Sequence, residues 1–400
     1  MQSVCCFQGR MRLCRPFSLA GERRTFFYAV ENSAKTRAAG TARFLPIVFE
    51  IKLLSERMIG MMKTQNSRRA ALSMGVLGLL LGALFLFSFV LGRYDVSPLE
   101  VMRILAAQVI PVEPTWTKSM QAVVLNVRLP RIALACMVGC ALSLAGTAYQ
   151  SVFQNPMAAP DILGASSGAC FGAALAILLG FAGGGVTLMA FACSMLTNAL
   201  VYLVSGRTKG SRSVSILLSG VMISSFFSAG TSYIKLVADP ADQLPAITYW
   251  MMGSLSGARG NDVAFAIIPM AIGALPLLLL RWRINLLTLG EEEASSLGVN
   301  TGRLRMAVVL SATFLTAASV AVSGMIGWVG LVIPHLSRKL VGNDCRHLMP
   351  TSMLMGALFM LLVDNVSRNL LATEIPIGIL TAFVGAPFFI YLMTRKESLL

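Results

Sequence analysis

Long runs of uncharged apolar residues recur along the chain from residue 71 almost to the C-terminus. A run of about 18 or more such residues is long enough to cross the hydrocarbon core of a bilayer as a helix. The runs cover residues 71–92, 132–153, 162–182, 184–206, 214–234, 263–280, 306–334, 348–367 and 375–394. The pattern therefore predicts an all-α membrane protein that is polytopic, not held by a single anchor.

The run 306–334 is too long for one crossing, because a helix rises only about 1.5 Å per residue and the hydrocarbon core is about 30 Å thick. Basic residues flank it at both ends (Arg303, Arg305, Arg338 and Lys339). The positive-inside rule places both flanks in the cytoplasm. We therefore expect one full helix and one shortened helix here, with the turn between Gly324 and Gly330, where three glycines favour a break.

Lys and Arg gather in loops that this topology places on one side of the membrane. These loops are residues 207–212, 281–283, 338–339 and 395–396, together with Lys63, Arg68 and Arg69. The segments 93–127 and 235–262, which fall on the other side, are richer in Asp, Glu and Pro. The charge pattern thus predicts a bundle of about ten transmembrane helices with both termini in the cytoplasm.

Three arginines break this charge pattern. Arg128, Arg131 and Arg368 fall at the outer side, which suggests a function for them. The alternative is that each snorkels to the membrane interface or forms a local ion pair. Asp364 is the only carboxylate within the apolar runs, and Arg368 follows it by one helical turn, so an ion pair between these two is expected.

Residues 1–61 differ from the rest of the chain. They contain ten Lys or Arg, and their apolar runs are too short to cross a membrane. The order of basic, apolar and cleavage regions that defines a secretory signal is absent from them. We expect either a disordered cytoplasmic extension or a start codon assigned too far upstream, with Met58, Met61 or Met62 as the true beginning. The transmembrane domain is then residues 62–400.

Composition and motifs narrow the function. The chain is 56% apolar and only 13% charged, which excludes an ordinary soluble domain. Cytoplasmic loops account for much of its net charge of +15, so nucleic-acid binding is not indicated. The sequence has no G-x-x-x-x-G-K-(S/T) phosphate loop, so the chain cannot hydrolyse ATP by that means. Its eight cysteines show no metal-binding spacing, and no metal site is expected.

The loop between the sixth and seventh crossings has the pattern of a short helix outside the bilayer. Thr288 and Glu291 have the spacing of a capping box, and Gly298 suits a helix C-terminus. Its narrow apolar stripe consists of Leu289, Ala294 and Leu297. Such a stripe fits a groove on another protein. A helix lying on the membrane surface is the alternative, but anionic lipid heads would repel its acidic first turn.

Taken in order, the segments resemble the FecCD family, the permease subunits of ABC importers for iron-siderophore, haem or cobalamin. The first matching pieces are R-L-P-R at 128–131, G-C-A-L-S-L-A-G-T-A-Y-Q at 139–150, N-P-M-A-A-P-D-I-L-G at 155–164, Y-W-M-M-G-S at 249–254 and L-T-L-G-E-E-E-A-S-S-L-G-V at 287–299. The later pieces are G-W-V-G-L-V-I-P-H-L-S-R at 327–338, D-N-V-S-R at 364–368 and E-I-P-I-G-I-L-T-A-F-V-G-A-P-F-F-I at 374–390. The likeness runs from about residue 70 to 395.

The resemblance implies a dimer of two permeases, identical or sister chains, in the cytoplasmic membrane of a bacterium. Two ATPase subunits would bind ATP and Mg below it, and a solute-binding protein would deliver cargo from above. This chain itself would bind no cofactor and catalyse no reaction. Arg128, Arg131 and Arg368 match the arginines that receive carboxylates of the binding protein in this family.

The resemblance also assigns roles on the cytoplasmic side. The residues matching the family's coupling helix, which rests on the ATPase, are Gly290, Glu291, Ala294, Leu297 and Gly298. A looser match places the inner gate at Ser211, Arg212 and Ser213.

Cargo and mechanism leave alternatives open. Within the family, iron-siderophore is the expected cargo, with haem or cobalamin as alternatives. The competing class is a secondary carrier that works alone, which would need an essential carboxylate inside the membrane. Only Asp364 could supply it. A membrane-embedded enzyme is the third class, but no nucleophile or metal cluster is visible at depth.

Overall fold

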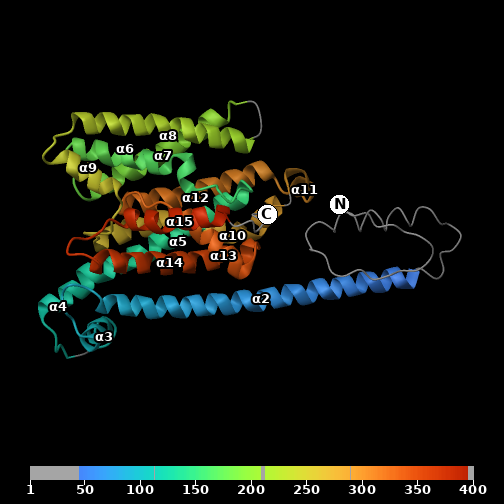
Figure 1. The fold of residues 1–400 in the computed structure, drawn as a ribbon, viewed down its shortest axis with the longest axis horizontal. Coiled ribbons are helices and arrows are strands. Elements are labelled where there is room, and N and C mark those ends of the chain that lie inside the picture. The colour runs from blue at the N-terminus through green and yellow to red at the C-terminus, as the bar shows by residue number, and fades with distance from the viewer. Residues whose placement is uncertain (1–44, 112, 209–211, 289, 395–400) are drawn as a thin grey trace. The chain divides into compact units, whose positions relative to one another are not determined.

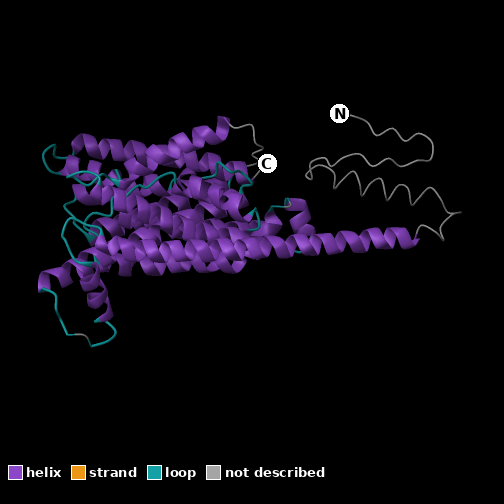
Figure 2. Ribbon diagram, turned by 60° about the horizontal axis from the view of Figure 1, so that its bottom comes forward, coloured by secondary structure: helices purple, strands orange, loops and turns teal. Residues whose placement is uncertain are grey.

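The computed structural model describes residues 45–394 except 112, 209–211 and 289. All regular elements in this part of the chain are helices, as Figure 2 shows. Internal contacts divide the chain into Met1–Gln65 and a larger unit, Asn66–Leu400. The arrangement described below is that of the larger unit. The expectation that residues 1–61 are an extension or a misassigned start stays a prediction.

The helices follow one another along the chain as labelled in Figure 1. The first half contains α2 (Leu45–Val90), α3 (Pro98–Ala106), α4 (Lys118–Ala122), the π-helix η1 (Val123–Arg128), α5 (Leu129–Val152), the 3₁₀ helix η2 (Pro160–Leu163), α6 (Ala165–Leu178) and α7 (Gly184–Ser205). The second half contains α8 (Arg212–Val237), α9 (Gln243–Met251), α10 (Gly260–Leu287), α11 (Glu291–Ser296), α12 (Thr301–Ser323), α13 (Val329–Val341), α14 (Cys345–Asn369) and α15 (Ile377–Thr394).

The predicted crossings all correspond to helices. Within the described residues, seven helical segments are long and apolar enough to span a membrane: Arg68–Val90, Lys118–Val152, Gly184–Ser205, Val214–Val237, Gly260–Leu287, Thr301–Ser323 and Cys345–Asn369. Two shorter apolar helices, α6 and α15, occupy the third and last predicted runs. Together with the short α13, these segments account for the ten crossings that the sequence predicted. The prediction of an all-helical polytopic membrane protein is confirmed.

The long run 306–334 is broken where its glycines indicated. α12 ends at Ser323 and α13 begins at Val329, so one full and one shortened helix are present. Gly324 has a φ of +68°, and a Cβ there would lie 2.3 Å from the carbonyl oxygen of Trp250. A side chain is therefore excluded at Gly324. The tight contact comes from α9, a helix in the outer segment 235–262 that the apolar pattern did not predict.

The centre of the larger unit is α5, which is buried along most of its length. It packs against α10, α12, α13 and α14. Two close approaches rely on facing glycines. A Cβ on Gly146 would lie 1.9 Å from the carbonyl oxygen of Gly330 in α13, and one on Gly139 would lie 2.2 Å from that of Gly356 in α14. Small residues at such crossings let membrane helices approach closely enough for their backbones to touch.

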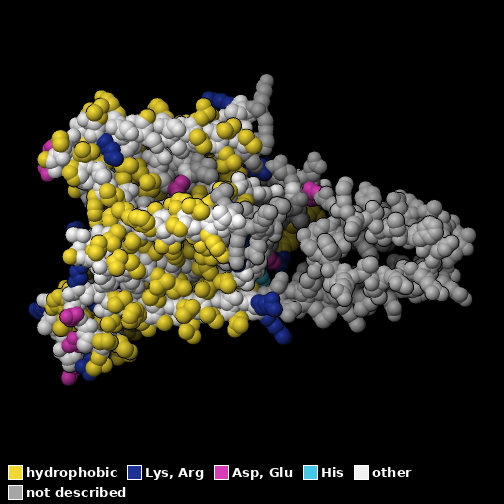
Figure 3. Space-filling model, viewed as in Figure 1, with side chains coloured by type: hydrophobic (Ala, Val, Ile, Leu, Met, Phe, Trp, Pro, Cys, Tyr) yellow, Lys and Arg dark blue, Asp and Glu magenta, His cyan; other side chains and the backbone are white. Residues whose placement is uncertain are grey.

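Large apolar side chains cover the outer surface of the bundle. Examples are Leu79, Leu218, Phe226, Leu279 and Phe383, all of them well exposed. Figure 3 shows such side chains spread over the side of the bundle, with most charged side chains at its two ends. A soluble protein rarely exposes a continuous apolar surface of this extent. The surface thus fits burial in the hydrocarbon of a bilayer.

Figure 1 shows α3 and α4 at one end of the bundle and α11 at the other. We call the first the outer end and the second the inner end, following the side that the positive-inside rule assigns to each. Candidate functional residues lie at both ends.

Candidate functional site

The three arginines predicted at the outer side lie where α2, α5 and α14 meet. Arg128 ends the π-helix η1, Arg131 follows in the first turn of α5, and Arg368 lies in the last turn of α14. α4, η1 and α5 form one uninterrupted helical segment, Lys118–Val152. Arg128 and Arg131 therefore lie within a helix rather than in the loop before it. All three arginines are buried in this chain.

Arg128 closes the end of α2. Its two terminal nitrogens donate hydrogen bonds to the backbone carbonyls of Phe89 and Tyr94. The last carbonyls of a helix have no partner within it and carry partial negative charge, so a guanidinium there is favourable. Gly92 makes room for it, because a Cβ on Gly92 would lie 2.7 Å from a terminal nitrogen of Arg128.

Arg131 and Arg368 share one buried carboxylate. The Nε of Arg131 donates to Oδ1 of Asp364 over 2.9 Å, and the Nε of Arg368 lies 3.2 Å from Oδ2. Asp364 is completely buried. Arg131 also pairs with Glu374 at 2.9 Å, and the Glu374 side chain is 26% exposed. We call Arg128, Arg131, Asp364, Arg368 and Glu374 the outer charge cluster.

The outer charge cluster connects three helices. Arg368 donates to the carbonyl of Ser88 at 3.4 Å, and Asn365 donates to the Ser88 hydroxyl at 2.7 Å. The last turns of α2 and α14 are thereby joined. The predicted ion pair between Asp364 and Arg368 is confirmed. For Arg368, the sequence offered a local ion pair as the alternative to a function, and that ion pair is present.

Two partners of Arg131 were not foreseen. Asp364 and Glu374 lie more than 230 residues away in the sequence, and spacing rules apply only within one helix. The balance of charges could have indicated a further acidic partner, because one carboxylate does not neutralise two arginines that lie close to it. A role of the three arginines in contacting a binding protein stays a prediction.

The short helix α11 lies at the inner end between α10 and α12. Ala294 is fully buried, whereas Leu297 is 61% exposed. Gly298, directly after the C-cap, has a φ of +80°, which confirms the predicted glycine-ended helix. Of the remaining predicted residues, Leu289 and the side chain of Glu291 lie outside the described part of the chain.

The predicted capping box at Thr288 is wrong. Gly290 is the N-cap of α11, with a φ of +117°, and it has no side chain to cap the helix. The hydroxyl of Thr288 instead donates to the carbonyl of Asn285 at 2.6 Å. Thr288 is the C-cap of α10, so its hydroxyl serves the helix before it and not the one after.

The predicted inner gate cannot be placed in full. Ser211 lies outside the described residues, as do the side chains of Arg212 and Ser213. The backbone of Arg212 begins α8. The gate assignment stays a prediction.

Comparison with known proteins finds close relatives over almost all of the helical part. Residues 80–395 match the FecCD transport family. The molybdate import system permease protein MolB of Haemophilus influenzae is 42% identical over 313 residues, which are 78% of this chain and 92% of that protein. A protein of Helicobacter pylori named probable iron chelatin transport system permease protein is 41% identical over 280 residues, or 70% and 85% of the two chains.

A solved structure resembles the fold as a whole. It is described as an inward-facing conformation of a metal-chelate type ABC transporter, and it is 41% identical in sequence. The match has a TM-score of 0.72 and covers 80% of this chain and 98% of the other. The agreement in sequence and in fold therefore extends over nearly the full length of that transporter chain.

Proposed function

The chain belongs to the FecCD transport family of ABC importer permeases, and from this we propose that it is the membrane path through which a complexed metal enters the cell. The match over residues 80–395 and the shared fold support this reading. The permease makes and breaks no bonds. ATP and Mg bind to a separate ATPase subunit, and a second permease copy, identical or sister, completes the path in the cytoplasmic membrane.

The position and the exposure of α11 are the main support for coupling between ATP hydrolysis and transport. It is connected directly to two spans, α10 and α12, and Leu297 at its end projects 61% of its side chain to the surface. Closure of the ATPase subunits around ATP would push on α11 and tilt these spans. α12 leads into the glycine break and α13, so a change at the inner end would reach the centre of the bundle. Two alternating arrangements of the helices then open the path to each side in turn.

The expected result of the decisive experiment is co-purification of an ATPase. The tagged full chain, extracted in mild detergent from the membranes of its own organism, should bring down a subunit that hydrolyses ATP. Leu297→Asp should release that subunit, because a charge would be buried in the groove without a partner. Leu99→Asp is the matched control, since Leu99 is 58% exposed and lies in α3 at the other end.

Retention of the ATPase by Leu297→Asp would contradict the role of α11. A stable chain that never associates with an ATPase would contradict the importer reading as a whole. In that case a stand-alone carrier would be the better description.

The outer end is proposed as the surface that meets the solute-binding protein. Arg128, Arg131 and Arg368 already have partners within the chain, so docking has to act through an exchange. Glu374 is the partly exposed partner of Arg131, and we propose that a carboxylate of the binding protein replaces it there. Asp364 would remain in place and keep both arginines oriented.

Chelated iron is the cargo we propose first. The relative from Helicobacter pylori and the solved metal-chelate transporter support it, each at 41% identity. Haem and cobalamin are alternatives that the same machinery could carry. Molybdate is a second candidate, because the relative from Haemophilus influenzae is a molybdate permease at 42% identity.

Transport in proteoliposomes separates these cargoes. The permease, its ATPase and its binding protein should accumulate radioactive iron-siderophore in the presence of ATP, and excess haem, cobalamin or molybdate should not compete. The same preparation with Leu297→Asp, which should not retain the ATPase, gives the background level of uptake. Accumulation of molybdate with no uptake of the iron chelate would overturn the iron assignment while leaving the importer mechanism intact.

A further inference from the structure

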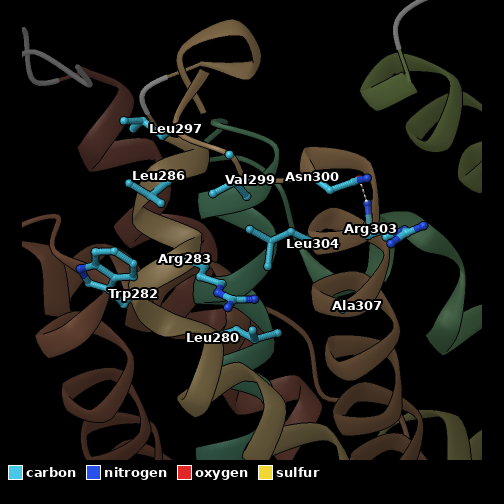
Figure 4. Close-up of a pocket in the computed structure, with 11 residues that line it drawn as sticks. Leu280, Trp282, Arg283, Leu286, Leu297, Val299, Asn300, Arg303, Leu304 and Ala307 are labelled. Atoms are coloured by element: carbon cyan, nitrogen blue, oxygen red, sulfur yellow. Dashed lines mark hydrogen bonds between the residues drawn. The ribbon is translucent and has the colours of Figure 1, made fainter. Parts of the chain in front are cut away.

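A cavity of about 740 Å³ lies at the inner end between the last turns of α10 and the first turns of α12. Figure 4 shows the side chains around it. It is lined by Leu280, Trp282, Arg283, Leu286, Leu297, Gly298, Val299, Asn300, Arg303, Leu304 and Ala307. A volume of this size is typical of sites that hold a small organic molecule.

The lining combines positive charge with apolar surface. Among the described residues that line the cavity, Arg283 and Arg303 are the charged ones, and none is a carboxylate. Within the described part of the chain, neither arginine has an acidic group at ion-pair distance. In Figure 4, Arg283 extends from α10 toward α12, whereas Arg303 lies at the edge and points away from α10. Most of the remaining side chains are apolar, so the cavity suits a molecule with an anionic head and an apolar body.

Exposed apolar side chains continue from the cavity along both helices. On α10, Leu275 and Leu279 precede Arg283 at intervals of four residues, and Leu279 is 80% exposed. On α12, Met306 and Leu310 follow Arg303 at helical spacing, and both are 41% exposed. Residues three or four apart lie on the same face of a helix. On each helix, exposed apolar side chains therefore follow the arginine toward the middle of the membrane.

We propose that this cavity binds one anionic phospholipid of the cytoplasmic leaflet, with its phosphate on Arg283 and its acyl chains against Leu280, Leu304 and Ala307. Arg303, which also lines the cavity, adds a second positive charge near it. Basic cavities between membrane helices on the cytoplasmic side are suited to anionic lipid heads. The bound lipid would also contact Val299, which lies between α11 and α12. The lipid site goes beyond the transport function and does not depend on the cargo.

Native mass spectrometry of the full chain in mild detergent tests the proposal. Titrated phosphatidylglycerol should bind as one tightly held molecule, and phosphatidylcholine, which carries no net charge, should bind at least tenfold more weakly. Arg283→Gln with Arg303→Gln should weaken phosphatidylglycerol binding about tenfold or more, because each basic residue near the surface contributes to the attraction. Arg68→Gln with Arg69→Gln is the matched control, since both are exposed at the start of the first span.

A second variant tests the cavity without changing its charge. Ala307→Phe should fill the apolar part of the cavity and displace the tightly held lipid while both arginines remain. The proposal would be overturned if phosphatidylglycerol binding were unchanged in the double variant of Arg283 and Arg303 or in Ala307→Phe. An equal loss in the Arg68 and Arg69 control would also overturn it, because general surface charge would then explain the binding. If the double variant of Arg283 and Arg303 instead releases the ATPase and leaves lipid binding unchanged, the cavity is a contact site for the ATPase and not for a lipid.

Discussion

Asp364→Asn is expected to abolish most folded protein. Asp364 is completely buried and is the carboxylate that Arg131 and Arg368 share, at 2.9 Å and 3.2 Å. Its neutralisation leaves Arg368 without an acidic partner among the described residues and Arg131 with Glu374 alone. Removal of one partner from a buried ion pair costs about 3–5 kcal/mol, because the remaining charge stays out of water. That is a large part of the stability of an ordinary domain.

The measurement is the thermal unfolding midpoint and the yield of monodisperse full chain in detergent. Glu113→Gln is the control, since it also removes one negative charge, from an exposed position near the outer end. Asp364→Leu combined with Arg368→Leu should recover part of the loss, because Arg131 then keeps Glu374 at 2.9 Å. A midpoint for Asp364→Asn equal to that of the control would show that the outer charge cluster does not hold these helices together.

Gly146→Ala is expected to prevent transport and to destabilise the chain by more than about 3 kcal/mol, beyond the usual 1–3 kcal/mol for an overfilled core. The added Cβ would lie 1.9 Å from the carbonyl oxygen of Gly330 and 2.7 Å from its Cα. Both atoms belong to the backbone, so no side-chain rotation relieves the overlap. α13 would have to move away from α5, and the contact that closes the centre of the bundle would be lost.

Gly82→Ala in α2 is the matched control. A Cβ there meets no atom within 4 Å, so the change should be neutral or slightly stabilising, as alanine favours helix. Both variants are compared by unfolding midpoint and by uptake in proteoliposomes. Normal uptake by Gly146→Ala would mean that the spacing of α5 and α13 is not critical for transport.

The sequence predicted those features that depend on neighbours along the chain. The apolar runs located the crossings, and the glycines of 324–330 located the break between α12 and α13. The pair between Asp364 and Arg368 followed from helical spacing within one element. Each of these inferences needed only a short window of residues.

Features that depend on tertiary packing were not predicted. Arg131 meets Asp364 and Glu374 across more than 230 residues. α9 packs against the break at Gly324, and its short length gave no span-like pattern. The capping box at Thr288 was misread because the hydroxyl had a competing acceptor in the preceding helix. The contact between α11 and an ATPase stays a prediction.

The π-helix η1 has a consequence for how the outer arginines can be engineered. A π-turn holds one more residue between its bonded groups than an α-turn. Positions before Val123 and after Arg128 therefore do not share one helical wheel. Deletion of one residue from 123–127 would convert the stretch to a regular helix and leave Lys118–Ala122 in nearly its present orientation relative to Arg131, because the π-turn spreads one extra residue over nearly the same rotation. The η1 stretch thus accommodates one extra residue in the helix without rotating the external segment relative to the span below it.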